Sequence, residues 1–351
     1  MGIDTGCKKL YNLHSSRFIS IDIEAQYMFF TKEDAFMDKI TRQALEIGRA
    51  NADEVISFRT KALRRRSQAI AKRAAALPAE LALTAPIATA IPESLALAAG
   101  SSGVLIAEGD SWFDYPWTDI LRVLEDGHGY DVESVAHAGD RVEQMAYSGG
   151  QLEEFSRQLE KLVRTGRIPK AILLSGGGND IAGPEFGMLL NHAASAVAGL
   201  NEQVVSGVID QRLRVAYLTI FAAATQICQK WLQRTVPILV HGYDYPIPDG
   251  RGFLGGLSFL PGPWLEPGFR DKGFDKLDDR KAIVKQLIDR FNKMLSGVAA
   301  LPQFKHVTYV DLRTTLSSGA NYKQFWDNEL HPTVKGFEMV TDRFVQVLDS
   351  L

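Results

Sequence analysis

From residue 103 onward, short apolar runs alternate with longer segments in which apolar residues recur at helical spacing. The short runs are rich in Val, Ile and Leu, which is typical of strands buried on both faces. The predicted strands are Val104–Ala107, Asp131–Val135, Ala171–Leu174, Ile238–His241 and Val307–Val310. This alternation predicts a parallel sheet covered by helices on both faces, that is, a three-layer α/β/α sandwich.

The segments between these runs predict the helices of the outer layers. They are Trp117–Glu125, Gln151–Arg164, Leu190–Arg234, Phe274–Leu301 and Lys335–Leu348. The third segment is long enough for two helices.

The first hundred residues have a different texture. After a short alternating stretch at 18–23, Thr31 and Asp34 indicate a helix cap, and periodic apolar positions predict a helix up to about Ala75. The following stretch is rich in Ala, Pro and Ser, which is typical of a semi-extended linker. We therefore divide the chain into a helical extension at 1–75, a linker at 76–102 and an α/β domain at 103–351.

The composition is that of an ordinary soluble globular protein, with 46% hydrophobic and 23% charged residues. Its 39 Lys and Arg against 42 Asp and Glu give a net charge of −3, which predicts no general attraction to nucleic acid. The two cysteines match no metal-ligand spacing and predict free thiols in a reducing compartment.

No segment predicts export or membrane insertion. Lys8 and Lys9 are not followed by the apolar stretch of a signal peptide. The most apolar stretch, 81–92, is far shorter than the roughly 20 residues that span a bilayer. A cytoplasmic location is therefore expected, with export by a leaderless route left open.

Polar blocks follow several predicted strands, at the edge of an open α/β sheet where ligands bind. Ser111 lies on a turn after the first strand, where its hydroxyl would be exposed at a helix N-terminus. Gly139 allows a close backbone approach, and the Asn179 amide can donate to an oxyanion. His331 and Pro332 form a further block just before the last helix.

These blocks resemble the SGNH (GDSL-type) hydrolase family. The matching motifs are Gly-Asp-Ser at 109–111, Gly139, Gly-x-Asn-Asp at 177–180 and His-Pro at 331–332, over roughly residues 103–351. The resemblance implies a flavodoxin-like sheet with strand order 2-1-3-4-5. It also implies that Ser111 attacks the acyl carbon and that His331 takes its proton. The implied oxyanion hole consists of the Ser111 and Gly139 N–H groups and the Asn179 side chain.

The chain departs from the family at the acid of the triad, which normally lies three residues before the histidine. That residue is Asn328 here, flanked by Asp327 and Glu329. Three alternatives stay open: Asn328 orients the imidazole by a hydrogen bond, Asp327 swings into the role, or a Ser-His dyad uses a backbone carbonyl.

The other polar residues near these blocks have simpler interpretations. The glycine run 176–178 lacks a following Lys-Ser/Thr, so no nucleotide site is predicted, and neither a cofactor nor a metal is expected. Asp110 and Asp180 are predicted to bond loop backbone. His137 is predicted to be a strand-end residue, and His241 either lines the pocket or is structural.

Three surface features bear on the substrate and partners. The Gly/Pro-rich segment 247–273 is either an apolar lid or a packed loop. An aromatic rim beyond the nucleophile comprises Trp112, Phe113, Tyr115 and Trp117. The basic stretch 59–73 could contact a membrane surface or an acidic protein, or could be a solvated helix face.

The sequence thus predicts a carboxylic ester hydrolase, an esterase or lipase acting on a small or lipid-like ester through a seryl-acyl intermediate. Two alternatives stay open. One is a carbohydrate deacetylase or thioesterase with the same site. The other is a non-catalytic binding module, for which Asn328 is the only support.

Overall fold

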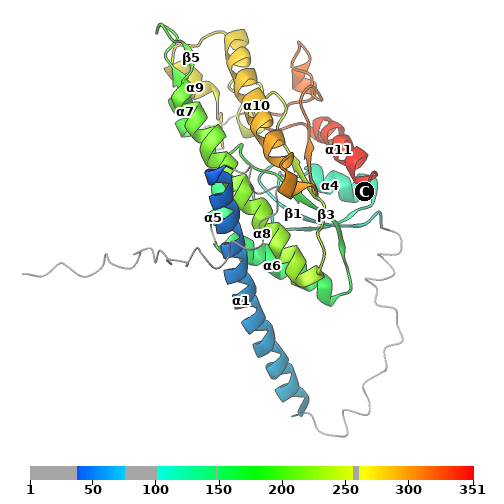
Figure 1. Ribbon diagram of the computed structural model, residues 1–351. Coiled ribbons are helices and arrows are strands. Elements are labelled where there is room, and N and C mark those ends of the chain that lie inside the picture. The colour runs from blue at the N-terminus through cyan, green and yellow to red at the C-terminus, as the bar shows by residue number, and fades with distance from the viewer. Residues whose placement is uncertain (1–37, 76–100, 148, 256–260) are drawn as a thin grey trace, which may run out of the picture. The chain divides into compact units, whose positions relative to one another are not determined.

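Five parallel strands form the central sheet of the described chain, which comprises residues 38–75, 101–147, 149–255 and 261–351 (Figure 1). They are β1 (Val104–Glu108), β2 (Asp131–Ser134), β3 (Pro169–Leu174), β6 (Ile238–His241) and β7 (Val307–Val310). The order β2-β1-β3-β6-β7 confirms the expected three-layer fold and its strand order. The stretch 18–23, the cap at Thr31 and Asp34, and nearly all of the linker lie outside the described residues.

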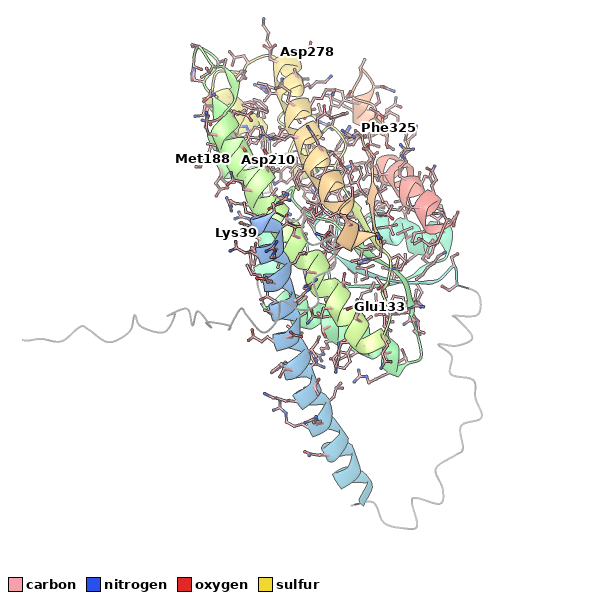
Figure 2. The ribbon with its side chains drawn as sticks, viewed as in Figure 1. Lys39, Glu133, Met188, Asp210, Asp278 and Phe325 are labelled. Carbon is pink, nitrogen blue, oxygen red and sulfur yellow. The ribbon has the colours of Figure 1, made fainter. Side chains whose placement is uncertain are left out.

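Helices cover the sheet on both faces. α4 (Ile120–His128) and α11 (Val334–Leu348) pack together on one face, while α8 (Arg214–Leu232) and α10 (Leu277–Ala299) cover the other with α5 (Val142–Tyr147) and α6 (Gly149–Arg164) (Figure 1). Side chains fill the space between the layers (Figure 2). Phe344 of α11 meets His241 at the end of β6, with 5.4 Å between ring centroids. Phe291 of α10 meets Tyr217 of α8 at 6.4 Å.

The segment 190–201 was wrongly predicted as helix. It forms the antiparallel pair β4 (Leu190–Asn191) and β5 (Gly199–Leu200), because the Asn191 amide donates to the carbonyls of Val197 and Leu200 and fixes the turn. The helix begins only after Asn201, whose side chain caps it by accepting from the Val204 N–H at 3.2 Å. From there α7 (Glu202–Val205), a π-helical segment (Ser206–Leu213) and α8 run without a break.

Shorter elements connect these layers. They are the 3₁₀ turns η3 (Pro184–Leu189), η5 (Phe253–Gly255), η6 (Pro302–Phe304) and η7 (Tyr322–Gln324), and the helix α9 (Glu266–Asp271).

The long helix α1 (Lys39–Ala75) packs along α8 (Figure 1). Gly48 makes this approach possible, because a Cβ there would lie 2.3 Å from the Thr219 carbonyl oxygen. The Thr219 hydroxyl also donates to the Ala44 carbonyl at 3.2 Å. Residues 39–351 form one compact unit. The three-part division of the chain stays a prediction, because 1–37 and 76–100 are not described.

The basic stretch of α1 is partly engaged within the fold. The Arg59 guanidinium donates to the carboxylates of Glu153 and Glu160 on α6 at 2.9 Å. Further along the helix, Lys61 and Arg64 are exposed. A membrane or protein contact through 59–73 stays a prediction. No helix in the described ranges is long and apolar enough to cross a membrane.

Candidate active site

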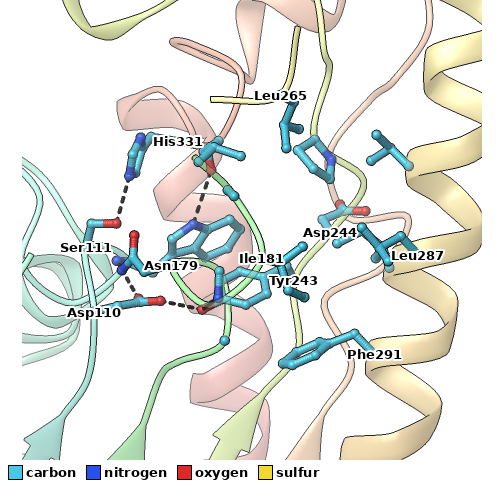
Figure 3. Close-up of a pocket in the computed structure, with 18 of the residues that line it drawn as sticks. Asp110, Ser111, Asn179, Ile181, Tyr243, Asp244, Leu265, Leu287, Phe291 and His331 are labelled. Carbon is cyan, nitrogen blue, oxygen red and sulfur yellow. Dashed lines mark hydrogen bonds between the residues drawn. The ribbon is translucent and has the colours of Figure 1, made fainter. Parts of the chain in front are cut away.

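The turn after β1 is built on the buried carboxylate of Asp110. Its Oδ1 accepts from the Trp112 N–H at 3.0 Å and from the Ser175 hydroxyl at 2.7 Å. The Tyr243 hydroxyl donates to Oδ2 (Figure 3). These bonds tie the turn to the ends of β3 and β6. Asp110 therefore bonds the loops, as predicted, and sets the backbone of the adjacent Ser111.

Ser111 and His331 lie in contact although 220 residues separate them in the sequence. The Ser111 Oγ is 2.8 Å from the His331 Nε2 (Figure 3). The imidazole is packed between Tyr115, which stacks on it at 4.3 Å between centroids, and the edge of Trp264 at 5.5 Å. This burial lowers the pKa of His331 to about 3, so the imidazole is neutral at ordinary pH.

Asn328 is the residue that the structure brings to the other side of the imidazole. Its Oδ1 lies 3.0 Å from the His331 Nδ1 and also accepts the backbone N–H groups of Leu330 and His331. Asp327 makes no such contact, since its Oδ2 accepts from the Tyr115 hydroxyl and the Asn328 amide. A carbonyl oxygen can only accept, so Nδ1 carries the proton and Nε2 is free to take one from Ser111.

The candidate oxyanion residues lie on three loops, with Ser111 after β1, Gly139 after β2 and Asn179 after β3. The Asn179 amide donates to the Asp140 carbonyl at 3.0 Å, and Asn179 lines the same pocket as Ser111. Gly139 has a φ of +95°, which favours glycine, and open space lies where a Cβ would stand. Gly139 is not among the residues that line the pocket. Asp180 accepts from the Val142 N–H at 2.9 Å at the start of α5, and burial raises its pKa to about 6.

An apolar pocket opens beside Ser111 and runs toward α10. Ser111, Asn179 and His331 lie at one end of it, and Leu287 and Phe291 of α10 lie at the other (Figure 3). The remaining apolar side chains that line it are Trp112, Ile181, Ala182, Phe186, Pro246, Leu265, Val284, Ile288, Trp326 and Leu330. The space beside the serine is therefore suited to a hydrocarbon group.

Glu329 was not singled out from the sequence, yet it organises one wall of this site. Its buried carboxylate accepts four backbone N–H groups, from Gly250, Trp264, Leu265 and Glu266, at 2.6–3.0 Å. Burial raises its pKa, and these four bonds oppose the rise. Glu329 thereby fastens the segment 247–273 to the histidine loop. The described part of that segment is packed, with Trp264 against His331 and Leu265 in the pocket.

The two other histidines near the blocks are not part of the Ser111–His331 pair. His241 is fully buried, its Nδ1 lies 2.8 Å from the Gly242 carbonyl, and it does not line the pocket. Burial lowers its pKa, which favours the structural interpretation. The His137 side chain is 58% exposed and lies 3.7 Å from the Asp140 carboxylate. In the described ranges, no group of His, Cys, Asp and Glu could hold a metal ion.

The predicted aromatic rim divides into two parts. Trp112 and Phe113 are buried in the core. Tyr115 lies on His331, and Trp117 is 67% exposed and stacks on Phe253 with 6.0 Å between centroids. Of the four rim residues, only Tyr115 and Trp117 can therefore contact a substrate at the protein surface.

Comparison with protein families identifies the domain that carries this site. The sequence model of the GDSL-like Lipase/Acylhydrolase family matches residues 98–339. The chain belongs to this family. The predicted SGNH resemblance is therefore confirmed, and the ester-hydrolysing class of this GDSL-type chain is supported with it. No curated protein matches the chain.

Several solved structures are similar to this GDSL-type chain. A lipase from a goat rumen metagenome is 13% identical over 70% of this chain and 96% of that chain, with a TM-score of 0.37. An acetylxylan esterase from Geobacillus stearothermophilus is 13% identical over 71% and 95%, with a TM-score of 0.37. A carbohydrate esterase family 3 structure from Talaromyces cellulolyticus is 10% identical over 71% and 99%, with a TM-score of 0.36.

Proposed function

We propose that this chain is a serine esterase that cleaves carboxylic esters with an apolar acyl group. The observation that carries the proposal is the 2.8 Å contact between the Ser111 hydroxyl and the His331 Nε2 at the end of an apolar pocket. A serine hydroxyl is a weak nucleophile until a neighbouring base takes its proton. The contact supplies that base.

The proposed reaction has two steps. The Ser111 Oγ attacks the acyl carbon while His331 Nε2 takes the hydroxyl proton, and the resulting imidazolium then protonates the leaving alcohol. Water next attacks the seryl ester with His331 again as base, which releases the carboxylic acid and restores Ser111. Throughout the cycle, Asn328 keeps the proton of the ring on Nδ1 by accepting from it.

The oxyanion of each tetrahedral intermediate is assigned to the N–H groups of Ser111 and Gly139 and to the Asn179 amide. Support comes from the position of Asn179 in the Ser111 pocket and from its bond to Asp140, which leaves the second amide hydrogen for a ligand. Loss of one such donor typically lowers kcat about a hundredfold or more. Asn179→Ala is therefore expected to lower kcat, while a fluorophosphonate should still label Ser111 alone.

Covalent labelling of the serine tests the proposal directly. The full chain and its Ser111→Ala variant are treated with a fluorophosphonate and read by intact mass. One adduct on the wild type and none on the variant is the expected result. No adduct on either would favour the non-catalytic binding module, and an adduct on the variant would mean that another residue is the nucleophile.

The acyl group is tested with aryl esters of acetate, butyrate, hexanoate and octanoate. Because the pocket beside Ser111 is apolar, we expect kcat/KM to rise with chain length. Ala182→Leu adds bulk to the pocket wall and should lower kcat/KM for octanoate far more than for acetate. Ala194→Leu, at an exposed position, is the matched control. A preference for acetate in the wild type would favour a deacetylase instead.

A further inference from the structure

The orientation of the Asn328 amide is fixed by its surroundings. Two backbone N–H groups, of Leu330 and His331, point at the same atom at 3.0 and 2.9 Å, so that atom must be the oxygen. The NH₂ group therefore points the other way. It donates to the Tyr115 hydroxyl at 2.9 Å and lies 3.3 Å from the Asp327 Oδ2. The side chain is fully buried, so these contacts define its position.

Tyr115 joins this amide to a carboxylate. Its hydroxyl accepts from the Asn328 NH₂ and donates to the Asp327 Oδ2 at 3.0 Å. Burial and the Asp327 carboxylate both raise the pKa of Tyr115, so the phenol keeps the proton that it donates. Its ring also stacks on the imidazole at 4.3 Å and 19°. Asn328 thus connects the imidazole to the Asp327 carboxylate by two routes, a direct hydrogen bond and a path through the Tyr115 hydroxyl.

We propose that Tyr115 and Asp327 are positioning residues that stabilise the His331 imidazolium through Asn328. This inference rests on the proposed function, since the imidazolium forms only when Ser111 gives up its proton. Hydrogen bonds in a chain polarise one another, so a carboxylate at the far end makes the Asn328 oxygen a stronger acceptor. The Tyr115 ring face adds an attraction for the cation stacked on it. Both effects act on the charged ring and hardly on the neutral one.

The same geometry explains why an amide stands at position 328. A carboxylate there would place a second negative oxygen about where the Asn328 NH₂ now lies, 3.3 Å from Asp327. Two carboxylates sharing a site cannot both ionise readily. With the charge at 327, which is exposed, the neutral amide can be buried beside the histidine without an unpaired charge.

The inference is tested first by removing one carboxylate. In the full chain with an aryl ester, Asp327→Asn should lower kcat about tenfold and leave KM unchanged, because only the charged ring loses stabilisation. Tyr115→Phe keeps the stack, removes the two bonds of the hydroxyl and should give a smaller loss, because the direct bond from the Asn328 amide to Asp327 remains. Since both residues act through Asn328 on the same charged ring, the Tyr115→Phe/Asp327→Asn variant should lose less than the product of the two single losses. Glu338→Gln, which neutralises an exposed carboxylate of α11, is the matched control and should leave kcat unchanged.

The decisive variant is Asp327→Asn/Asn328→Asp, which moves the charge to the inner position. It should restore kcat and shift the acid limb of kcat/KM to higher pH, because a carboxylate in contact with the ring raises the histidine pKa. The groups against the imidazole are Ser111, Asn328, Tyr115 and Trp264, of which only Tyr115 titrates. Asp327 lies beyond Tyr115, and Asp110 is bonded to the loops below Ser111.

The outcomes separate the two proposals. Unchanged kcat in Asp327→Asn, with the wild type turning over, would overturn this inference alone. So would an Asp327→Asn/Asn328→Asp variant with the kcat and pH profile of Asp327→Asn, if its melting temperature matches that of the wild type. Absence of both labelling and turnover in the wild type would overturn the proposed function, and this inference with it.

Discussion

Ser111 and His331 are each held in place by a buried hydrogen-bond acceptor, and the two acceptors differ in charge. On the serine side, the Asp110 carboxylate is buried and accepts from Trp112, Ser175 and Tyr243. On the histidine side, the buried acceptor is the neutral amide oxygen of Asn328, which accepts from Leu330 and from the backbone and ring of His331. The carboxylate that is bonded to the Asn328 amide, that of Asp327, is exposed.

The difference separates a carboxylate that builds the site from one that takes part in the proposed catalysis. The charge of Asp110 is met by three donors whatever the state of His331, so it contributes equally before and during the reaction. The charge of Asp327 reaches the imidazole through Asn328, both by the direct bond from the Asn328 amide and by way of Tyr115. Its contribution should therefore appear mainly when the ring is protonated.

The largest expected effect comes from removing the base between the two sides. His331→Gln should lower kcat about a thousandfold or more, since Ser111 would lose its proton acceptor. His137→Gln is the control, because the His137 side chain is exposed and its ring lies beside the Asp140 carboxylate, at 3.7 Å. Its kcat for an aryl ester should stay within about twofold of the wild type. A large loss of kcat in His137→Gln would show that the base has been assigned to the wrong histidine.

Much of the fold could be predicted, because buried strands can be recognised in the sequence as short apolar runs. β6 and β7 have the predicted bounds, and β1 differs by one residue. The segment 190–201 could not be predicted, because its turn depends on Asn191 reaching two carbonyls across a short pair of strands. Such side-chain to backbone bonds leave no periodic trace in a sequence.

The site was predictable to a similar degree. The block after the first strand pointed to Ser111 and the block before the last helix pointed to His331, and the structure brings the two residues into contact. The aromatic residues beyond the serine looked alike in sequence, yet only Tyr115 stacks on the imidazole. Likewise, the sequence offered Asp327 as an alternative acid and gave Glu329 no role, although both are acidic and flank Asn328. Their roles depend on which loop each carboxylate faces in space.

A moderate effect on stability is expected from Asp110→Asn on the serine side. In the variant, an NH₂ group replaces one of the two carboxylate oxygens. A buried group that donates to that oxygen in the wild type therefore loses its acceptor. Such a loss destabilises a fold by about 1–3 kcal/mol. The melting temperature should fall by about 2 °C or more. The distinction between the Asp110 and Asp327 carboxylates would be wrong if Asp110→Asn had the melting temperature of the wild type but a lower kcat.

The smallest expected effect concerns Glu108, at the end of the strand that carries Ser111. Unlike Asp110, neither of its buried carboxylate oxygens has a hydrogen-bond partner in the described ranges. Burial, followed by the nearby carboxylates of Asp140 and Glu154, raises its pKa well above the usual 4.5. The folded protein therefore keeps a proton that the unfolded chain releases.

The pH dependence of that contribution follows from linkage. Glu108 contributes fully to stability below pH 4.5, and the contribution is lost as pH rises through the raised pKa of the folded state. Glu108→Gln cannot ionise, so it should raise the melting temperature at pH 8 and change it little at pH 4.5. Asp110→Asn should lower the melting temperature at pH 8, which makes the two variants opposite in sign. A gain from Glu108→Gln that does not depend on pH would show that repacking, rather than the carboxylate charge, is responsible.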